Sequence, residues 1–399
     1  MSYSDGAGLD GLQQTVDRLA ARLGRSVAID DTQGRLVVSS GHFGEEDELR
    51  VFAIVHRYSD PRVLAHFKKH GIYSWDRPGR IPADAELGFK ARVCCPIRDH
   101  DILFGHLFLI DEGVEDDEVE EAAAATVQIG QLMYRRLMLH EESQQRAAEL
   151  TRGLISSEPA DRARAWDRLA DQEVVAGTDC SVALVARVVG PVPDTEDVQA
   201  DLQAAVEMAT GDRARASVAW VRPVEAVVLV LGGGQALARQ VAERIAARMV
   251  AVGRRMVVGI GGEEAGADGA AASHDDARLA ARAATLLPEL GPVVGAESLG
   301  VYRLLLRLPP GELAASRYPA ELRRLVDADS NDNLVETLAA YLSCAGDVTA
   351  ASAALHVHRS TLYYRLGRIE EIAGVDLRDG EQRLRLHLGL KMRRLVERS

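Results

Sequence analysis

Residues 359–369 read Arg-Ser-Thr-Leu-Tyr-Tyr-Arg-Leu-Gly-Arg-Ile and place guanidinium, hydroxyl and phenol groups at helical spacing. Leu362, Leu366 and Ile369 recur at intervals of four and three residues, which predicts a buried helix face and turns the polar side chains outward. A guanidinium in the first turn of such a helix can reach a guanine edge, and arginines at its margins suit phosphate contacts. The residues predicted to contact DNA are Arg359, Ser360, Thr361, Tyr363, Tyr364, Arg365 and Arg368, with a core position as the alternative for Tyr363.

A short helix and a tight turn precede this segment. Asp347 can accept hydrogen bonds from the free backbone N–H groups of a helix over residues 348–355, and several alanines keep that helix slim. Residues 356–358 form the turn. Two short helices joined in this way are typical of a helix-turn-helix, whose second helix enters the major groove of double-stranded DNA. The structural alternative is a helix pair of an enzyme without a nucleic-acid contact.

The stretch GDVTAASAALHVHRSTLYYRLGRIEEIAGVDLRDGEQRLRLHLGLKM, residues 346–392, resembles the C-terminal domain of PucR/CdaR-type regulators. That family typically reads His-Arg-Asn-Thr-Leu, then Tyr-Arg-Leu, then a Gly-Val/Leu-Asp-Leu turn before a final helix. Ser360 stands where Asn is usual, so the base preference differs while the position stays small and polar. The resemblance implies a transcription regulator that responds to a small metabolite. In the final helix one apolar stripe is predicted from Leu384, Leu388, Met392 and Leu395.

The charge of the chain is unevenly distributed. The whole chain carries a formal charge of −13, whereas residues 331–399 contain ten basic and nine acidic residues. A nearly neutral tail offers DNA phosphates little general attraction, so the local arrangement of its charges must supply it. Two joined copies would also bind more tightly than one, because the second site then acts at a high effective concentration.

Residues 175–308 alternate predicted strands and helices in an order that resembles the nucleotide-cyclase or GGDEF fold. Diguanylate cyclases carry GGDEF on the hairpin between the middle strands, but residues 221–225 read Val-Arg-Pro-Val-Glu, and the first strand lacks the metal-binding Asp. Two-metal phosphoryl chemistry needs those carboxylates. We therefore predict no catalytic residue, no metal ligand and no cofactor, with a cyclic-nucleotide signalling enzyme or a nucleotide-binding scaffold as the alternatives. The glycines at 232–234 lack the rest of a phosphate loop and predict a turn.

Residues 1–115 carry short predicted strands and a helix over residues 48–56. The segments VAIDDTQGRLVVSSG and ARVCCPIRDHDILFGHLFLID resemble parts of a GAF domain, which implies a sensor for a small-molecule effector. Candidate ligand-binding residues are Tyr73, Trp75 and Arg92, with ordinary packing or surface exposure as the alternative. The predicted strands lie at residues 27–30, 36–39, 93–97 and 102–110.

A long helix is predicted within residues 116–160, which we assign to coupling and dimerisation. Small and apolar residues recur there at spacings of three and four, which gives one stripe. Pairing with a second copy in a homodimer is favoured over packing onto the same domain. The stripe consists of Val119, Ala123, Thr126, Gly130, Met133 and Leu137.

The sequence thus predicts a multidomain α+β protein: a GAF-like sensor over residues 1–115, a coupling helix, a cyclase-like α/β sandwich, and an all-α helix-turn-helix domain over residues 327–399. Its apolar runs are too short to cross a membrane and no export signal is visible, so we expect a cytoplasmic protein. The spacing of the four cysteines resembles neither a zinc site nor a disulfide framework, which agrees with that compartment. For the adjacent Cys94 and Cys95, a buried strand is favoured over a redox sensor. A scaffold that binds only other proteins is the third functional alternative.

Overall fold

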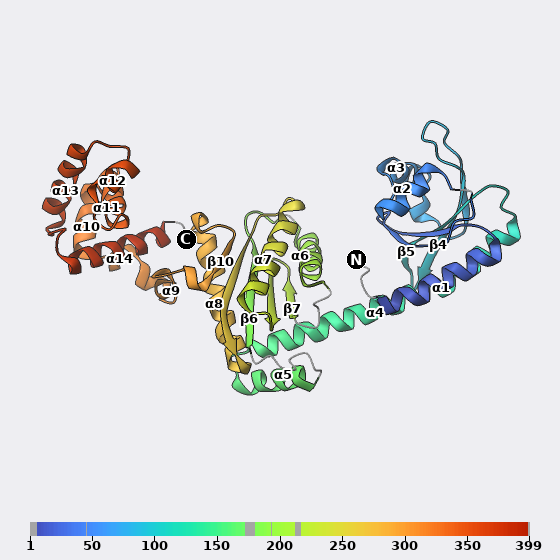
Figure 1. Ribbon diagram of the computed structural model, residues 1–399, viewed down its shortest axis with the longest axis horizontal. Helices are drawn as coiled ribbons and strands as arrows, with labels where there is room; N and C mark the ends of the chain where they lie inside the picture. Colours follow the sequence, from blue (N-terminus) through green and yellow to red (C-terminus); the bar gives the residue numbers. More distant parts are fainter. Residues whose placement is uncertain (1–5, 45, 172–179, 193, 212–216, 398–399) are drawn as a thin grey trace. The chain divides into compact units, whose positions relative to one another are not determined.

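The computed structural model describes residues 6–44, 46–171, 180–192, 194–211 and 217–397. The chain is mixed α/β and divides into two compact units, Met1–Arg146 and Ala147–Ser399 (Figure 1). Each unit contains one five-stranded sheet, and the second unit ends in a group of helices. The predicted combination of α/β domains with an all-α tail is confirmed. Over the described ranges, no helix has both the length and the apolar character needed to span a bilayer.

The sheet of the first unit is antiparallel, with the strand order β2-β1-β5-β4-β3. The predicted hairpin between its two longest strands turns at His100 and Asp101, whose φ angles of 47° and 63° are left-handed. The strands are β1 (Val27–Asp31), β2 (Leu36–Ser39), β3 (Gly79–Ile81), β4 (Arg92–Asp99) and β5 (Ile102–Ile110). The helices are α1 (Gly6–Leu23), α2 (Glu48–His56), α3 (Pro61–Lys69), the single turn η1 (Ile72–Ser74) and the first part of α4 (Asp116–Leu154).

Alternate residues of β4 and β5 face opposite sides of this sheet. Cys95 and Leu107 pack with residues of α1 and α4 in one apolar cluster, whereas Cys94 and Phe108 pack with residues of α2, α3 and η1 in another. Both cysteines are buried, and burial raises the pKa of both thiols, that of Cys95 to about 12. A buried neutral thiol is a poor nucleophile, so the strand interpretation holds over the redox sensor.

The stripe predicted to pair two copies through α4 packs within its own unit instead. Met133 is 5% exposed and lies in the same cluster as Leu107 of β5. A Cβ atom on Gly130 would stand 2.7 Å from the backbone oxygen of Arg98, so the small residue permits close contact with the β4–β5 hairpin. The dimer prediction for this stripe was therefore wrong, because helical spacing identifies a buried face but not the surface that buries it.

The sheet of the second unit has the strand order β10-β9-β6-β8-β7 and is mixed, since only β10 runs parallel to its neighbour β9. Helices α6 and α7 contribute to the cluster on one face, while α8 packs on the other face and against α5 (Figure 1). A Cβ atom on Gly259 of β9 would lie 2.0 Å from the backbone oxygen of Ala277, so α8 rests directly on the strand. The elements are α5 (Pro159–Asp171), β6 (Cys180–Val188), α6 (Thr195–Thr210), β7 (Ser217–Arg222), β8 (Glu225–Leu231), α7 (Gly234–Ala251), β9 (Met256–Ala265), α8 (Gly266–Leu286) and β10 (Val293–Gly295).

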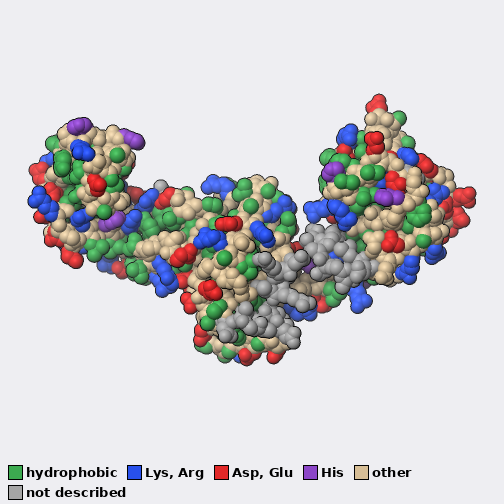
Figure 2. Space-filling model, in the orientation of Figure 1, with side chains coloured by type: hydrophobic (Ala, Val, Ile, Leu, Met, Phe, Trp, Pro, Cys, Tyr) green, Lys and Arg blue, Asp and Glu red, His purple; other side chains and the backbone are tan. Residues whose placement is uncertain are grey.

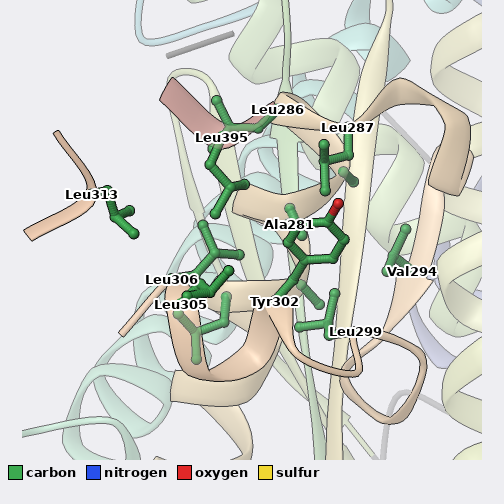
Figure 3. Packing of buried hydrophobic residues seen from close by; sticks show 14 of the residues in the cluster. Ala281, Leu286, Leu287, Val294, Leu299, Tyr302, Leu305, Leu306, Leu313 and Leu395 are labelled. Atoms are coloured by element: carbon green, nitrogen blue, oxygen red, sulfur yellow. The ribbon is translucent and has the colours of Figure 1, made fainter. Parts of the chain in front are cut away.

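The helical tail continues the core of this unit. Leu395 of the last helix joins the cluster that contains Leu286 and Leu306, as Figure 3 shows. The stripe predicted for that helix is only half correct, because Met392 and Leu395 are buried while Leu384 is 61% exposed. The helices are α9 (Tyr302–Leu305), α10 (Ala320–Ala328), α11 (Asn333–Ser343), α12 (Val348–Ala354), α13 (Arg359–Ala373) and α14 (Gly380–Val396).

Candidate nucleic-acid interface

Helix α12 and the turn after it fix the start of α13. Oδ1 of Asp347 accepts from the backbone N–H of Thr349 at 2.7 Å, which confirms the predicted cap. His356 in the turn has φ 53°, a left-handed conformation that few non-glycine residues adopt. His358 then caps α13: its Nδ1 accepts from the backbone N–H of Ser360 at 3.3 Å. Side-chain caps at Asp347 and His358 therefore fix the starts of the two helices of the helix-turn-helix.

The inward face of α13 is the predicted one. Leu362, Leu366 and Ile369 are buried in the core cluster of the second unit. Helix α13 contacts α10, α11 and α12, so three helices support it from behind. A helix held in this way presents one fixed outer face.

That outer face carries most of the residues predicted to contact DNA. Arg359, Ser360 and Thr361 are exposed in the first turn, and Tyr363 and Tyr364 are 63% and 70% exposed. The alternative that places Tyr363 in the core is thus wrong. In the part of the chain that the structure describes, Arg359 has no ion pair, so its guanidinium is available to a ligand.

Two of the predicted arginines are already engaged. Nη1 of Arg365 donates to Oγ1 of Thr337 on α11 at 3.1 Å, and Arg365 is half-buried. Arg368 is exposed and pairs with Glu371, less than one helical turn away. Figure 2 shows Lys and Arg side chains interspersed with Asp and Glu on the drawn face of this domain, in keeping with its near-neutral charge.

The three candidate ligand-binding residues of the first unit do not converge on one cavity. Tyr73 lines a narrow cavity beside Asp30, whereas Trp75 lies at a shallow surface depression over residues 75–79. Arg92 is 4% exposed, and its Nη2 lies 3.0 Å from Oδ1 of Asp47. The sequence did not single out Asp30 or Asp47, since an isolated acid within a strand or before a helix carries no motif.

The hairpin at residues 221–225 of the GGDEF-like domain contains one carboxylate, and this carboxylate forms ion pairs with arginines. Glu225 lies 2.5 Å from Nη2 of Arg187 and also pairs with Arg222. Asp276 of α8 is 3% exposed and pairs with Arg303 and with Arg307, the latter at 2.9 Å. Over the described ranges, no group of three or more His, Cys, Asp or Glu residues could hold a metal ion.

Two family models match this chain. Residues 334–392 match the PucR C-terminal helix-turn-helix domain, and residues 157–283 match a GGDEF-like domain. The second match begins before the predicted domain start at residue 175 and includes α5.

Relatives of known role align with nearly the whole chain. The DNA-binding transcriptional activator AdeR of Bacillus subtilis is 24% identical over 97% of this chain and 94% of its own length. The proline-responsive transcriptional activator PutR of Bacillus subtilis is 20% identical over 98% and 97%. The carbohydrate diacid regulator of Escherichia coli is 40% identical over 21% of each chain. A solved structure, the regulator of polyketide synthase expression from Bifidobacterium adolescentis, covers 64% of this chain and 100% of its own with 17% identity and a TM-score of 0.28, too low to support a conclusion. The chain thus carries a GGDEF-like domain and a PucR-type helix-turn-helix, and its relatives are transcription regulators of the PucR/CdaR type.

Proposed function

We propose that the chain regulates transcription by inserting the first turn of α13 into the major groove of operator DNA. The observation that supports this proposal is Arg359, which is exposed and has no ion pair among the described residues, beside the exposed Ser360 and Thr361. These residues lie on α13, whose inner face packs against α10, α11 and α12. Arg359 reads a guanine edge or a neighbouring phosphate, and Tyr364 contacts the sugar-phosphate backbone. Arg368 contacts phosphate after releasing Glu371, whereas Arg365 mainly holds α13 on α11.

We further propose that two copies bind paired half-sites as a homodimer, since one helix-turn-helix reads few base pairs. The buried stripe of α4 is unavailable for this pairing. Outside that stripe the same helix exposes Val127 by 59% and Leu139 by 54%, and these apolar side chains support a pairing surface on α4.

A small-molecule effector bound to the GAF-like first unit is the proposed signal, and α4 passes it on. The name of the relative PutR, a proline-responsive activator, supports control of this kind. The GGDEF-like domain is proposed to be a scaffold without catalysis, because its hairpin carboxylate Glu225 is bound by two arginines. We place the protein in the cytoplasm, where operator DNA is found.

The test is selection of bound fragments from sheared genomic DNA by full-length protein, followed by titration of the recovered sequence. Arg359→Ala should lose most of the affinity, and Arg323→Ala, which removes an exposed arginine on α10, should keep it. Failure of the wild type to enrich any fragment over random DNA would reject the proposed function.

A further inference from the structure

The face of the first unit's sheet that lies under α2, α3 and η1 buries charged groups, whereas the opposite face is apolar. Asp30 is 5% exposed, Arg50 3% and His106 1%. Burial of a charge is costly unless a partner compensates it. The partners of these charges therefore distinguish a structural role from a ligand-binding one.

Arg92 and Asp47 compensate one another. Nη2 of Arg92 lies 3.0 Å and 3.1 Å from the two carboxylate oxygens of Asp47, which also accepts from the backbone N–H groups of Arg50 and Lys90. Although burial acts to raise it, the Arg92 charge and these hydrogen bonds keep the pKa of Asp47 below its ordinary value. This pair serves the fold.

Asp30 and Arg50 lack such a pairing. Oγ of Ser59 donates to Asp30 at 2.9 Å, and Nη2 of Arg50 donates to the backbone oxygen of Phe108 at 3.3 Å. Nε of Arg50 is buried without a hydrogen-bond partner, and no ion pair between described residues joins Arg50 to Asp30. Burial raises the pKa of Asp30 and lowers that of Arg50 to about 10, and the attraction between the two charges opposes both shifts without cancelling them.

A narrow cavity lies beside Asp30. Its other walls include Tyr73, His106, Phe67 and Phe108. Nε2 of His106 donates to the backbone oxygen of Ile72 at 3.1 Å, so Nδ1 of the neutral ring is left as an acceptor. The cavity does not admit a water molecule in this conformation, so its walls, which include Tyr73 of η1, must move apart before a ligand enters.

We propose that this face binds a free α-amino acid, with its ammonium group on Asp30 and its carboxylate on Arg50. One small zwitterion compensates both buried charges at once, whereas a simple amine leaves Arg50 unpaired and a simple carboxylate leaves Asp30 unpaired. The ligand side chain packs on the apolar walls formed by Phe67 and Phe108. This inference rests on the proposed effector control and names the class of the effector.

Isothermal titration calorimetry of the full-length protein with each of the twenty L-amino acids tests the proposal. At least one amino acid should bind once per chain. The amine that lacks its carboxylate and the acid that lacks its amino group should each bind about 100-fold more weakly, because each leaves one buried charge unpaired. Equal binding of either analogue would overturn the proposal, and so would the absence of binding by all twenty at millimolar concentration.

Two substitutions assign the contacts. Asp30→Asn should weaken binding of the amino acid about tenfold or more, yet change binding of the deaminated acid little. Arg50→Gln should weaken binding of the amino acid to a similar extent, yet change binding of the decarboxylated amine little. Asp76→Asn and Arg77→Gln, both at exposed positions, are the matched controls. Wild-type affinity in both buried variants would overturn the assignment. Should a variant fail to fold by circular dichroism, the analogue series on the wild type decides alone.

The DNA titration keeps this inference separate from the proposed function. Amino-acid binding that changes operator affinity supports both. Binding that leaves operator affinity unchanged keeps the site and rejects its role as an effector site. Operator binding by a protein that no amino acid binds rejects the ligand class and keeps the DNA-binding function.

Discussion

Nη1 of Arg365 donates a 3.1 Å hydrogen bond to Oγ1 of Thr337, and so ties α13, the helix proposed to contact DNA, to a fully buried residue of α11. The same hydroxyl donates to the backbone oxygen of Asn333 at 2.6 Å. Arg365 is therefore a positioning residue, although its spacing in the sequence suits a phosphate contact. Loss of the Arg365 side chain should destabilise α13 itself, whereas loss of a DNA-contacting side chain should lower only the affinity for DNA.

Arg365→Met should lower the free energy of unfolding of the helical tail by about 1–3 kcal/mol, because Thr337 then loses a charged donor. Arg368→Met, which breaks only the exposed pair with Glu371, should change it by less than about 1 kcal/mol. Hydrogen exchange of the α13 amides in the full-length protein measures both. Equal protection in the two variants would show that the Thr337 contact contributes nothing.

The exposed arginines should differ in their effect on DNA. Arg359→Ala should cost about 1–3 kcal/mol on the preferred sequence and little on random DNA, since a base contact is lost. Arg368→Ala should weaken all sequences similarly and reduce the salt slope by about one. Titrations at several salt concentrations on both DNAs separate the two patterns. Unchanged affinity for both variants would place the DNA on another face.

Removal of the ion-pair partner of Arg368 should have the opposite effect on DNA affinity to removal of Arg368 itself. Glu371→Gln removes the carboxylate that holds this guanidinium and one negative charge near the DNA. Affinity for all sequences should rise a few-fold, with a steeper salt dependence. Glu336→Gln, which removes an exposed carboxylate on α11, serves as the control. A loss of affinity in Glu371→Gln would mean that the pair orients Arg368 for its contact.

Local patterns predicted the helix-turn-helix well because its signals lie close together in the chain. The cap at Asp347 and the buried Leu362, Leu366 and Ile369 all appear where the sequence places them. The partner of Arg365 could not be predicted, because Thr337 lies on a helix 28 residues earlier and its direction depends on how three helices pack.

Long-range contacts also explain why the α4 stripe was misassigned and why the buried charges were missed. The periodicity of α4 is the same whether a second copy or the sheet covers it, and only the fold brings Gly130 against Arg98. No sequence motif links Asp30 to Arg50. Only the topology of β1, β5 and α2 places the two residues on one face of the sheet.

The GGDEF-like domain should not convert GTP. With magnesium and the purified full-length protein, chromatography should detect no cyclic dinucleotide above a protein-free blank, since Glu225 is engaged by Arg187 and Arg222. An active diguanylate cyclase run in parallel is the control for the assay. Product above the blank would make the signalling enzyme the better description of this domain.

Gly130→Ala should destabilise the first unit. The new methyl group would meet the backbone oxygen of Arg98 at 2.7 Å, and relief of such overpacking costs about 1–3 kcal/mol. Val127→Ala on the exposed side of the same helix should change stability by less than about 0.5 kcal/mol. Urea titrations compare the two. A stable Gly130→Ala variant would mean that the hairpin moves away from α4 at little cost.

Acid should weaken the first unit through His106. Burial lowers the pKa of this imidazole from 6.5 to about 4, with the hydrogen bond to Ile72 acting in the other direction. Between these values the unfolded chain binds a proton that the folded chain does not, so stability rises with pH. The contribution is complete above pH 6.5 and is lost as the pH falls toward 4, a change on the order of 3 kcal/mol.

His106→Gln, which can still donate to Ile72, should remove most of that pH dependence, whereas His100→Gln, at a residue with a 64% exposed side chain, should leave it in place. Trp75 is the tryptophan of this unit, so replacement of Trp166 and Trp220 by Phe makes its fluorescence a report on this unit alone. Urea midpoints at pH 7 and pH 4.5, without added amino acid, give the comparison. Because Glu46 and the other acids titrate alike in both variants, the difference between the two slopes isolates His106. Parallel slopes would show that the ring is protonated in the folded state and that water reaches the cavity beside Asp30.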